Sequence, residues 1–179
     1  MIMRRLAILC LLVLSACATD PPAPGAEVVA AAADTSGPFR LTFVLPRAFW
    51  TEADSITGEA TLALVDGTAR PIWGSGHGVI GFAFKEVGGT REMGPAWNLD
   101  CGKHSLMPDQ PLVSAMVKSG GFGNDEPDAA FYRAFFRDPL VHLPAGTWDI
   151  TAIADFLDGP SCSGAHHEMS ATIRIDVGR

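Results

Sequence analysis

Basic residues are scarce in this sequence, where 13 lysines and arginines stand against 20 aspartates and glutamates. A chain without a basic surface lacks the electrostatic footprint for nucleic acid, and for docking on anionic lipid or glycan. An acidic surface is compatible with cation binding, although solubility alone also explains it. Internal repeats are absent as well, and no apolar run reaches the about 20 residues that span a bilayer.

Sequence motifs for several common chemistries are also missing. The glycine-rich segment 73–78 is followed by neither Lys-Ser nor a helical pattern, which excludes a phosphate-binding loop. Its serine lacks the spacing of a nucleophile elbow. The acidic segment 119–128 does not match the ligand spacing of an EF-hand. Serines, histidines and carboxylates are present without a recognisable triad motif, so an envelope enzyme is the least favoured of three functions.

The N-terminal residues have the layout of a secretory signal. Arg4 and Arg5 form a positive start, residues 6–14 are apolar, and small residues lead into Cys17. The apolar run is too short for a membrane span. The sequence therefore predicts export from the cytoplasm.

This leader resembles those of bacterial lipoproteins, through Leu-Ser-Ala-Cys at 14–17. In that family the cysteine thiol receives a diacylglyceryl group, the chain is cut before it, and the new amine is acylated. The resemblance implies a signal peptide at 1–16 and a lipid on Cys17 that anchors the protein in a membrane. Ala18 implies the outer membrane, facing the periplasm. An ordinary signal peptide, cut after Ala16-Cys17-Ala18, is the alternative.

Residues 17–37 follow as a segment rich in alanine and proline. The prolines oppose regular structure, and the alanines offer little to bury. We predict a tether that ends at residue 37 and one domain over 38–179. Without the leader the chain keeps 11 basic and 20 acidic residues, a net charge of −9.

Two cysteines remain for the domain, because Cys10 leaves with the leader and Cys17 carries the lipid. Cys101 and Cys162 lie in contexts rich in glycine and serine, in an oxidising compartment. We expect them to form one disulfide. A metal-binding or redox pair is the alternative, although the CxxC spacing is absent.

Apolar and polar residues alternate with period two through most of 38–179, as in half-buried strands. The clearest runs are 148–156 and 169–177, and further strands are predicted at 39–45, 58–65, 79–87 and 112–117. Segment 129–136 is predicted as a strand, with a helix as the alternative because Phe131, Phe135 and Phe136 also fit helical spacing. About seven short strands without a long amphipathic helix predict an all-β, antiparallel sandwich.

The order of these strands resembles that of bacterial immunoglobulin-like lipoprotein domains. The resemblance depends on the strands at 59–66 and 81–86 and above all on the turn Leu-Pro-Ala-Gly-Thr-Trp at 143–148. In that family such a turn precedes the penultimate strand, and its aromatic residue packs at a corner of the sandwich. The resemblance implies an immunoglobulin-like fold with Trp148 in that place, and it includes no catalytic motif.

The segment His166-His167-Glu168-Met169 is the sharpest chemical feature. Two imidazoles and a thioether suit copper, so His166, His167 and Met169 are candidate ligands, with His104, Met107 and His77 as further candidates. The alternative is a polar segment with two unrelated histidines. In that case Met169 is the first core residue of the last strand, where the alternation places it inward with Ile173.

The sequence thus favours a non-enzymatic, lipid-anchored envelope protein that binds a protein partner or acts as an accessory module. A periplasmic copper-binding protein is the second hypothesis, and no other cofactor is expected.

Overall fold

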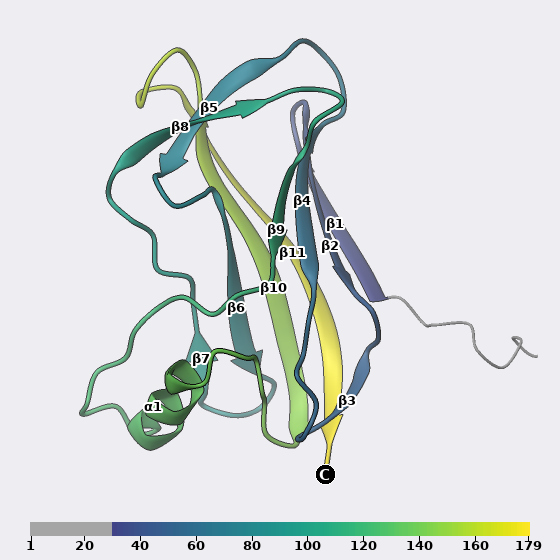
Figure 1. Cartoon of the computed structure of the whole chain (residues 1–179), viewed down its shortest axis with the longest axis vertical. Coiled ribbons are helices and arrows are strands. Elements are labelled where there is room, and N and C mark those ends of the chain that lie inside the picture. Colours follow the sequence, from purple (N-terminus) through teal and green to yellow (C-terminus); the bar gives the residue numbers. More distant parts are fainter. Residues whose placement is uncertain (1–29) are drawn as a thin grey trace, which may run out of the picture.

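The computed structural model describes residues 30–179 (Figure 1). The predicted signal peptide 1–16, Cys17 and the first part of the predicted tether lie outside the described residues. The described part contains eleven strands and one short helix, which confirms the all-β class. Among residues 30–179, no helix is both long enough and apolar enough to cross a membrane.

An antiparallel sheet of four strands forms one layer, in the order β1, β2, β4, β9. Its strands are β1 (Ala30–Ser36), β2 (Phe39–Leu45), β4 (Glu59–Leu64) and β9 (Leu112–Ala115). Alternation along β2 turns Phe39, Leu41, Phe43 and Leu45 toward the other sheet, and all four are fully buried. The predicted strand at 39–45 is confirmed.

A sheet of seven strands forms the second layer. Its main path runs through β3 (Phe49–Thr51), β11 (Ala165–Gly178), β10 (Gly146–Asp158), β5 (Arg70–Ser75) and β8 (Cys101–Leu106). Beside β5, the strand β6 (Ile80–Glu86) pairs with the same edge of β10, and β7 (Glu92–Met93) pairs with β6.

The long hairpin of β10 and β11 is the backbone of this second sheet. Its register pairs Gly146 with Val177 at one end and Asp158 with Ala165 beside the turn. The even-numbered residues from Trp148 to Phe156 and the odd-numbered residues from Met169 to Val177 are all buried. The alternation predicted for both strands is therefore confirmed.

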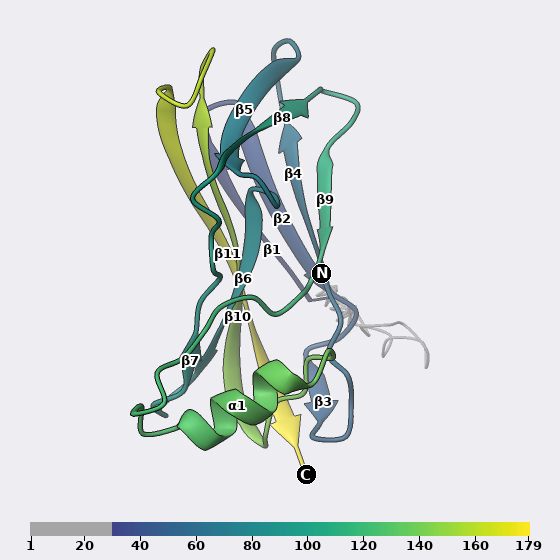
Figure 2. The same ribbon diagram turned by 60° about the vertical axis from the view of Figure 1, so that its left-hand side comes forward.

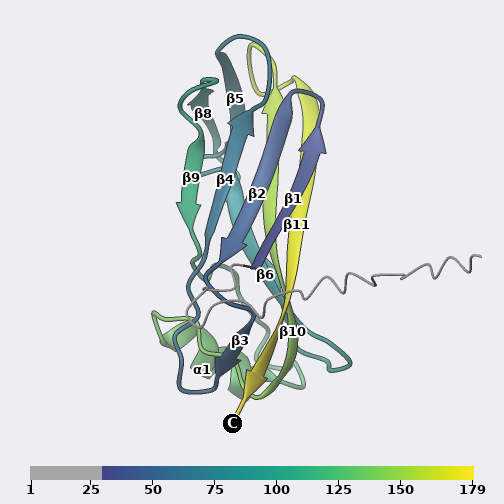
Figure 3. The same ribbon diagram turned by 90° about the vertical axis from the view of Figure 1, so that its right-hand side faces the viewer.

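The two sheets lie face to face and share one hydrophobic core (Figure 3). Aromatic contacts join the layers: the rings of Phe39 and Phe156 are 4.8 Å apart, and those of Phe43 and Phe82 are 5.7 Å apart. Each large apolar side chain that is removed from water contributes roughly 1.5–3 kcal/mol. Core packing, rather than any surface ion pair, holds the layers together.

A single helix, α1 (Ala129–Arg137), covers one end of the core (Figure 2). Its Phe135 ring lies 5.5 Å from that of Phe84, and Phe131 stacks on Trp148 at 6.2 Å. The Lys118 ammonium donates hydrogen bonds to the carbonyl oxygens of Phe135 and Leu140. The first contact satisfies a carbonyl of the last helical turn and the second satisfies one in the segment that follows. Burial there lowers the pKa of Lys118.

The structure corrects the predicted end of the tether. Residues 30–36, which lack an apolar pattern, form β1 and pair with β2 along their whole length. Backbone pairing outweighs the poor strand propensity of alanine here, and Ala30 and Ala32 pack against the core. The Asp34 carboxylate also accepts a hydrogen bond from the backbone N–H of Ser170 at 3.0 Å, so β1 is fastened to β11 as well.

The strand predicted at 129–136 is wrong, because these residues form α1. Phe135 is buried and Phe131 and Phe136 are partly buried against the core, which agrees with the alternative helical spacing. The predicted number of strands is too small for a different reason. Proline and glycine in β5, and lysine and histidine in β8, hide the alternation of these two strands, which pair with each other.

Candidate functional site

The two histidines of the predicted copper site lie on opposite faces of β11. His166 points away from the core, with its Nε2 2.7 Å from Asp155 Oδ1. His167 points the other way: its ring stacks on Phe156 at 5.2 Å, and its Nδ1 lies 3.0 Å from Ser36 Oγ. Adjacent residues of a strand alternate between faces, so these imidazoles do not converge on one metal ion.

The other candidate copper ligands are dispersed too. Met169 is a core residue, 1% exposed, as the alternative interpretation predicts. His104 Nε2 lies 3.0 Å from the Ser75 carbonyl oxygen, His77 is exposed in a turn, and Met107 forms an isolated bridge with Gln110. No group of three or more His, Cys, Asp or Glu side chains among residues 30–179 is placed to hold a metal ion.

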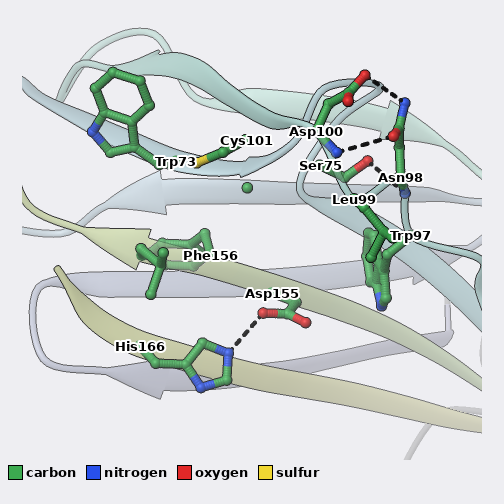
Figure 4. Close-up of a pocket in the computed structure, with 12 residues that line it drawn as sticks. Trp73, Ser75, Trp97, Asn98, Leu99, Asp100, Cys101, Asp155, Phe156 and His166 are labelled. Atoms are coloured by element: carbon green, nitrogen blue, oxygen red, sulfur yellow. Dashed lines mark hydrogen bonds and ion pairs between the residues drawn. The ribbon is translucent and has the colours of Figure 1, made fainter. Parts of the chain in front are cut away.

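A hollow of about 300 Å³ opens instead on the outer face of the large sheet (Figure 4). We call it the outer-face hollow. Cross-strand pairing places His166, Leu157 and Trp73 in one row, on β11, β10 and β5. Asp155 precedes Leu157 by two residues on β10, on the same face, and forms a hydrogen bond with His166. The floor is thus apolar, with an imidazole–carboxylate pair at its edge.

The loop at 94–100 forms the facing wall of the outer-face hollow. Asn98 donates its backbone N–H to Ser75 Oγ at 3.2 Å, and its side-chain oxygen accepts the Asp100 N–H at 3.0 Å. Trp97 lies over Gly81, where an added Cβ would be 2.9 Å from the indole Cη2. Gly81 therefore permits the close approach of the loop to the sheet.

Leu99, in the same loop, is 100% exposed. Its neighbours Asn98 and Asp100 are both fixed by hydrogen bonds. Because this side chain is fully in solvent, it makes no hydrophobic contribution to the stability of the free protein. This exposed side chain lies beside Trp97, and Trp73 lines the opposite side of the outer-face hollow (Figure 4).

The predicted disulfide between Cys101 and Cys162 is present, with Cα atoms 6.2 Å apart. It joins the start of β8 to the turn between β10 and β11. Trp73 Nε1 donates a hydrogen bond to the Gly159 carbonyl oxygen of that turn at 3.0 Å. Two side-chain links therefore hold the turn against β5 and β8, at the margin of the outer-face hollow.

The titratable side chains that line the outer-face hollow are those of Asp100, Asp155 and His166, and no lysine or arginine lines it. Two ion pairs lie further along this face. Arg174 donates hydrogen bonds to both carboxylate oxygens of Asp149, which lowers the pKa of Asp149, and Lys85 pairs with Glu92 at 2.8 Å. The lining of the outer-face hollow thus combines two carboxylates with apolar side chains.

The parts of a hydrolytic triad are present but not assembled. The carboxylate of Asp155 forms a hydrogen bond with the imidazole of His166. The hydroxyl of Ser36 contacts a different imidazole, that of His167, on the opposite face of the sheet. Within the outer-face hollow the hydroxyl is that of Ser75, which is buried and accepts the Asn98 and His77 backbone N–H groups. A nucleophile needs its base within hydrogen-bond reach, and no serine pairs with His166 among residues 30–179.

Sequence reasoning singled out His166, Cys101 and the segment 73–78, but it missed Trp97, Leu99, Asp100 and Asp155 as site residues. The first half of the glycine-rich segment 73–78 belongs to β5. The alternation of β10 does place Asp155 outward, which is a usable signal. The path of loop 94–100 across the sheet leaves no signature that reveals where Trp97 and Leu99 lie.

Comparisons of the chain with protein-family models, with curated proteins and with solved structures gave no match.

Proposed function

We propose that this protein is a non-enzymatic, lipid-anchored module of the bacterial cell envelope that binds a protein partner through the outer-face hollow and Leu99. The single observation that carries the binding half is the full exposure of Leu99, which lies beside Trp97 on a hydrogen-bonded loop at a hollow that Trp73 also lines. Exposed apolar groups with a polar rim are typical of interaction surfaces. Asn98, Asp100 and the Asp155–His166 pair supply that rim.

The immunoglobulin-like assignment is part of this proposal. Two packed antiparallel layers and the turn at 143–148 that leads into β10 support it. Trp148, the last residue of that segment, is fully buried and donates its Nε1 hydrogen to the Pro144 carbonyl oxygen at 3.0 Å. In such domains a rigid two-layer core presents binding loops and sheet faces. A copper carrier and an enzyme are the less favoured functions, because their candidate residues do not come together.

Anchoring is the second half of the proposal, and the leader with Cys17 supports it. We expect wild-type protein to fractionate with membranes and to incorporate labelled fatty acid, and Cys17→Ser protein to lose both properties. Lipid chains hold a protein in a bilayer at about 0.8 kcal/mol per buried methylene, so their removal releases it. Cys10→Ser is the matched control, since the predicted cleavage removes Cys10. Unlabelled wild-type protein, or a Cys17→Ser variant that stays on membranes, contradicts the anchor.

The binding half is tested in living cells by a photocross-linking residue at position 99, compared with one at position 113. Val113 is also exposed, at 56%, but lies on β9 of the other sheet. We expect a protein adduct from position 99 and none from position 113.

A further inference from the structure

We propose that the outer-face hollow receives a basic side chain of the protein partner, with arginine preferred over lysine. This inference rests on the proposed function, and it specifies the chemistry of the partner. Its first support is charge. The hollow contains Asp100 and Asp155 and no lysine or arginine, in a chain that is acidic as a whole. An incoming anion would meet like charge, whereas a cation meets complementary charge.

The carboxylates retain capacity for a ligand. Asp155 uses Oδ1 toward His166, and its Oδ2 accepts no hydrogen bond from residues 30–179. Asp100 accepts one hydrogen bond on Oδ2, from the Asn98 amide, and its Oδ1 accepts none within the same described range. Neither forms an ion pair with a lysine or arginine of that range, as Asp149 does with Arg174. A guanidinium offers five N–H donors in a planar fork, which matches free carboxylate oxygens.

The two indoles provide the second support. Cations are attracted to the face of an aromatic ring within about 6 Å, and tryptophan is the strongest partner. Trp73 already has the Lys103 ammonium 6.0 Å from its ring centre, so this ring faces a cation in the free protein. Guanidinium groups also stack on aromatic faces, whereas the strongly hydrated ammonium does so less well. This difference is the reason to expect arginine.

The indoles are fixed before any ligand arrives. Trp73 is held by its hydrogen bond to Gly159, and Trp97 lies against the sheet at Gly81, where an added Cβ would meet its ring. A prearranged site loses less conformational entropy on binding. At about 300 Å³, the outer-face hollow is at the small end of ligand sites, which suits one long side chain.

Nuclear magnetic resonance of the four indole N–H groups tests this proposal. The sample is the mature lipidated chain in detergent, and the probe is Nα-acetyl-arginine methylamide. We expect the signals of Trp73 and Trp97 to shift on titration. Trp50 and Trp148 are internal controls, because they are 3% and 0% exposed. The lysine analogue should require a higher concentration, and the neutral norleucine analogue should shift neither signal.

Two variants sharpen the measurement. Asp100→Asn with Asp155→Asn should raise the half-saturating concentration of the arginine probe about fivefold or more, since each exposed charge pair contributes up to about 1 kcal/mol. Lys103→Gln should lower it, because a competing cation above Trp73 is removed. Equal shifts with norleucine, or shifts with methyl glucoside alone, overturn the proposal in favour of an apolar group or a sugar.

Absence of any shift also overturns the proposal. If the adduct from position 99 forms in that case, the partner binds without a basic side chain and the proposed function stands. If the adduct fails to form, the proposed function itself is wrong.

Discussion

Replacing Trp148 with alanine should lower the free energy of unfolding by about 3–5 kcal/mol, the range for the loss of a buried tryptophan. Trp148 is fully buried at the start of β10, stacks on Phe131 at 6.2 Å, and donates its Nε1 hydrogen to Pro144. Its loss opens a cavity where β10 and α1 meet. Equilibrium urea unfolding, with constant m-value, measures the effect.

Two further substitutions control this experiment. Trp148→Phe keeps most of the apolar volume, so it should cost less than Trp148→Ala. Trp73→Ala removes an indole of the outer face, where less surface is buried, and should also cost less. A change below about 1 kcal/mol for Trp148→Ala contradicts the core position of this residue and weakens the immunoglobulin-like proposal.

Loss of the disulfide should have a comparable effect. Cys101 and Cys162 are 61 residues apart in sequence, and the chain-entropy model assigns about 4 kcal/mol to closing such a loop in the unfolded state. Cys162→Ser should therefore lower the free energy of unfolding by a few kcal/mol. Because the bond holds the turn between β10 and β11 near Trp73, it should also disturb the indole signal of Trp73.

The double variant Cys101→Ser with Cys162→Ser is the matched control. Both cysteines serve one bond, so the double variant should lose no more stability than Cys162→Ser alone. Reduced wild-type protein should unfold at the same urea concentration as the double variant. Equal stability of oxidised and reduced wild-type protein would show that the bond contributes nothing to the fold.

The sequence predicted best those elements that bury one face and expose the other. The runs at 148–156 and 169–177 alternate without interruption because one side of the hairpin packs on the core. β1 was not predicted because its alanines show no apolar alternation, and its conformation depends on backbone pairing with the next strand, β2. Segment 129–136 was ambiguous because its phenylalanines satisfy both periods, and contact of Phe135 with Phe84 favours the helix.

The candidate site was less accessible to sequence reasoning. Adjacent histidines suggested a joint ligand pair, yet the same alternation that identified the strand sends them to opposite faces. The outer-face hollow joins residues from β5, β10, β11 and the loop 94–100, which are far apart in the chain. Only the disulfide, predicted from two remaining cysteines, indicated that β8 and the turn of the last hairpin meet.

The central claim is that the outer face around Leu99 is the binding surface of this protein. The most direct test inserts p-benzoylphenylalanine at position 99 or at position 113 of the full chain, in separate strains, and irradiates growing cells. Immunoblots then report adducts of higher mass. The account predicts a discrete protein adduct from position 99, weakened by Trp97→Ala, and none from position 113. An adduct from position 113 alone, or none from position 99, would contradict it.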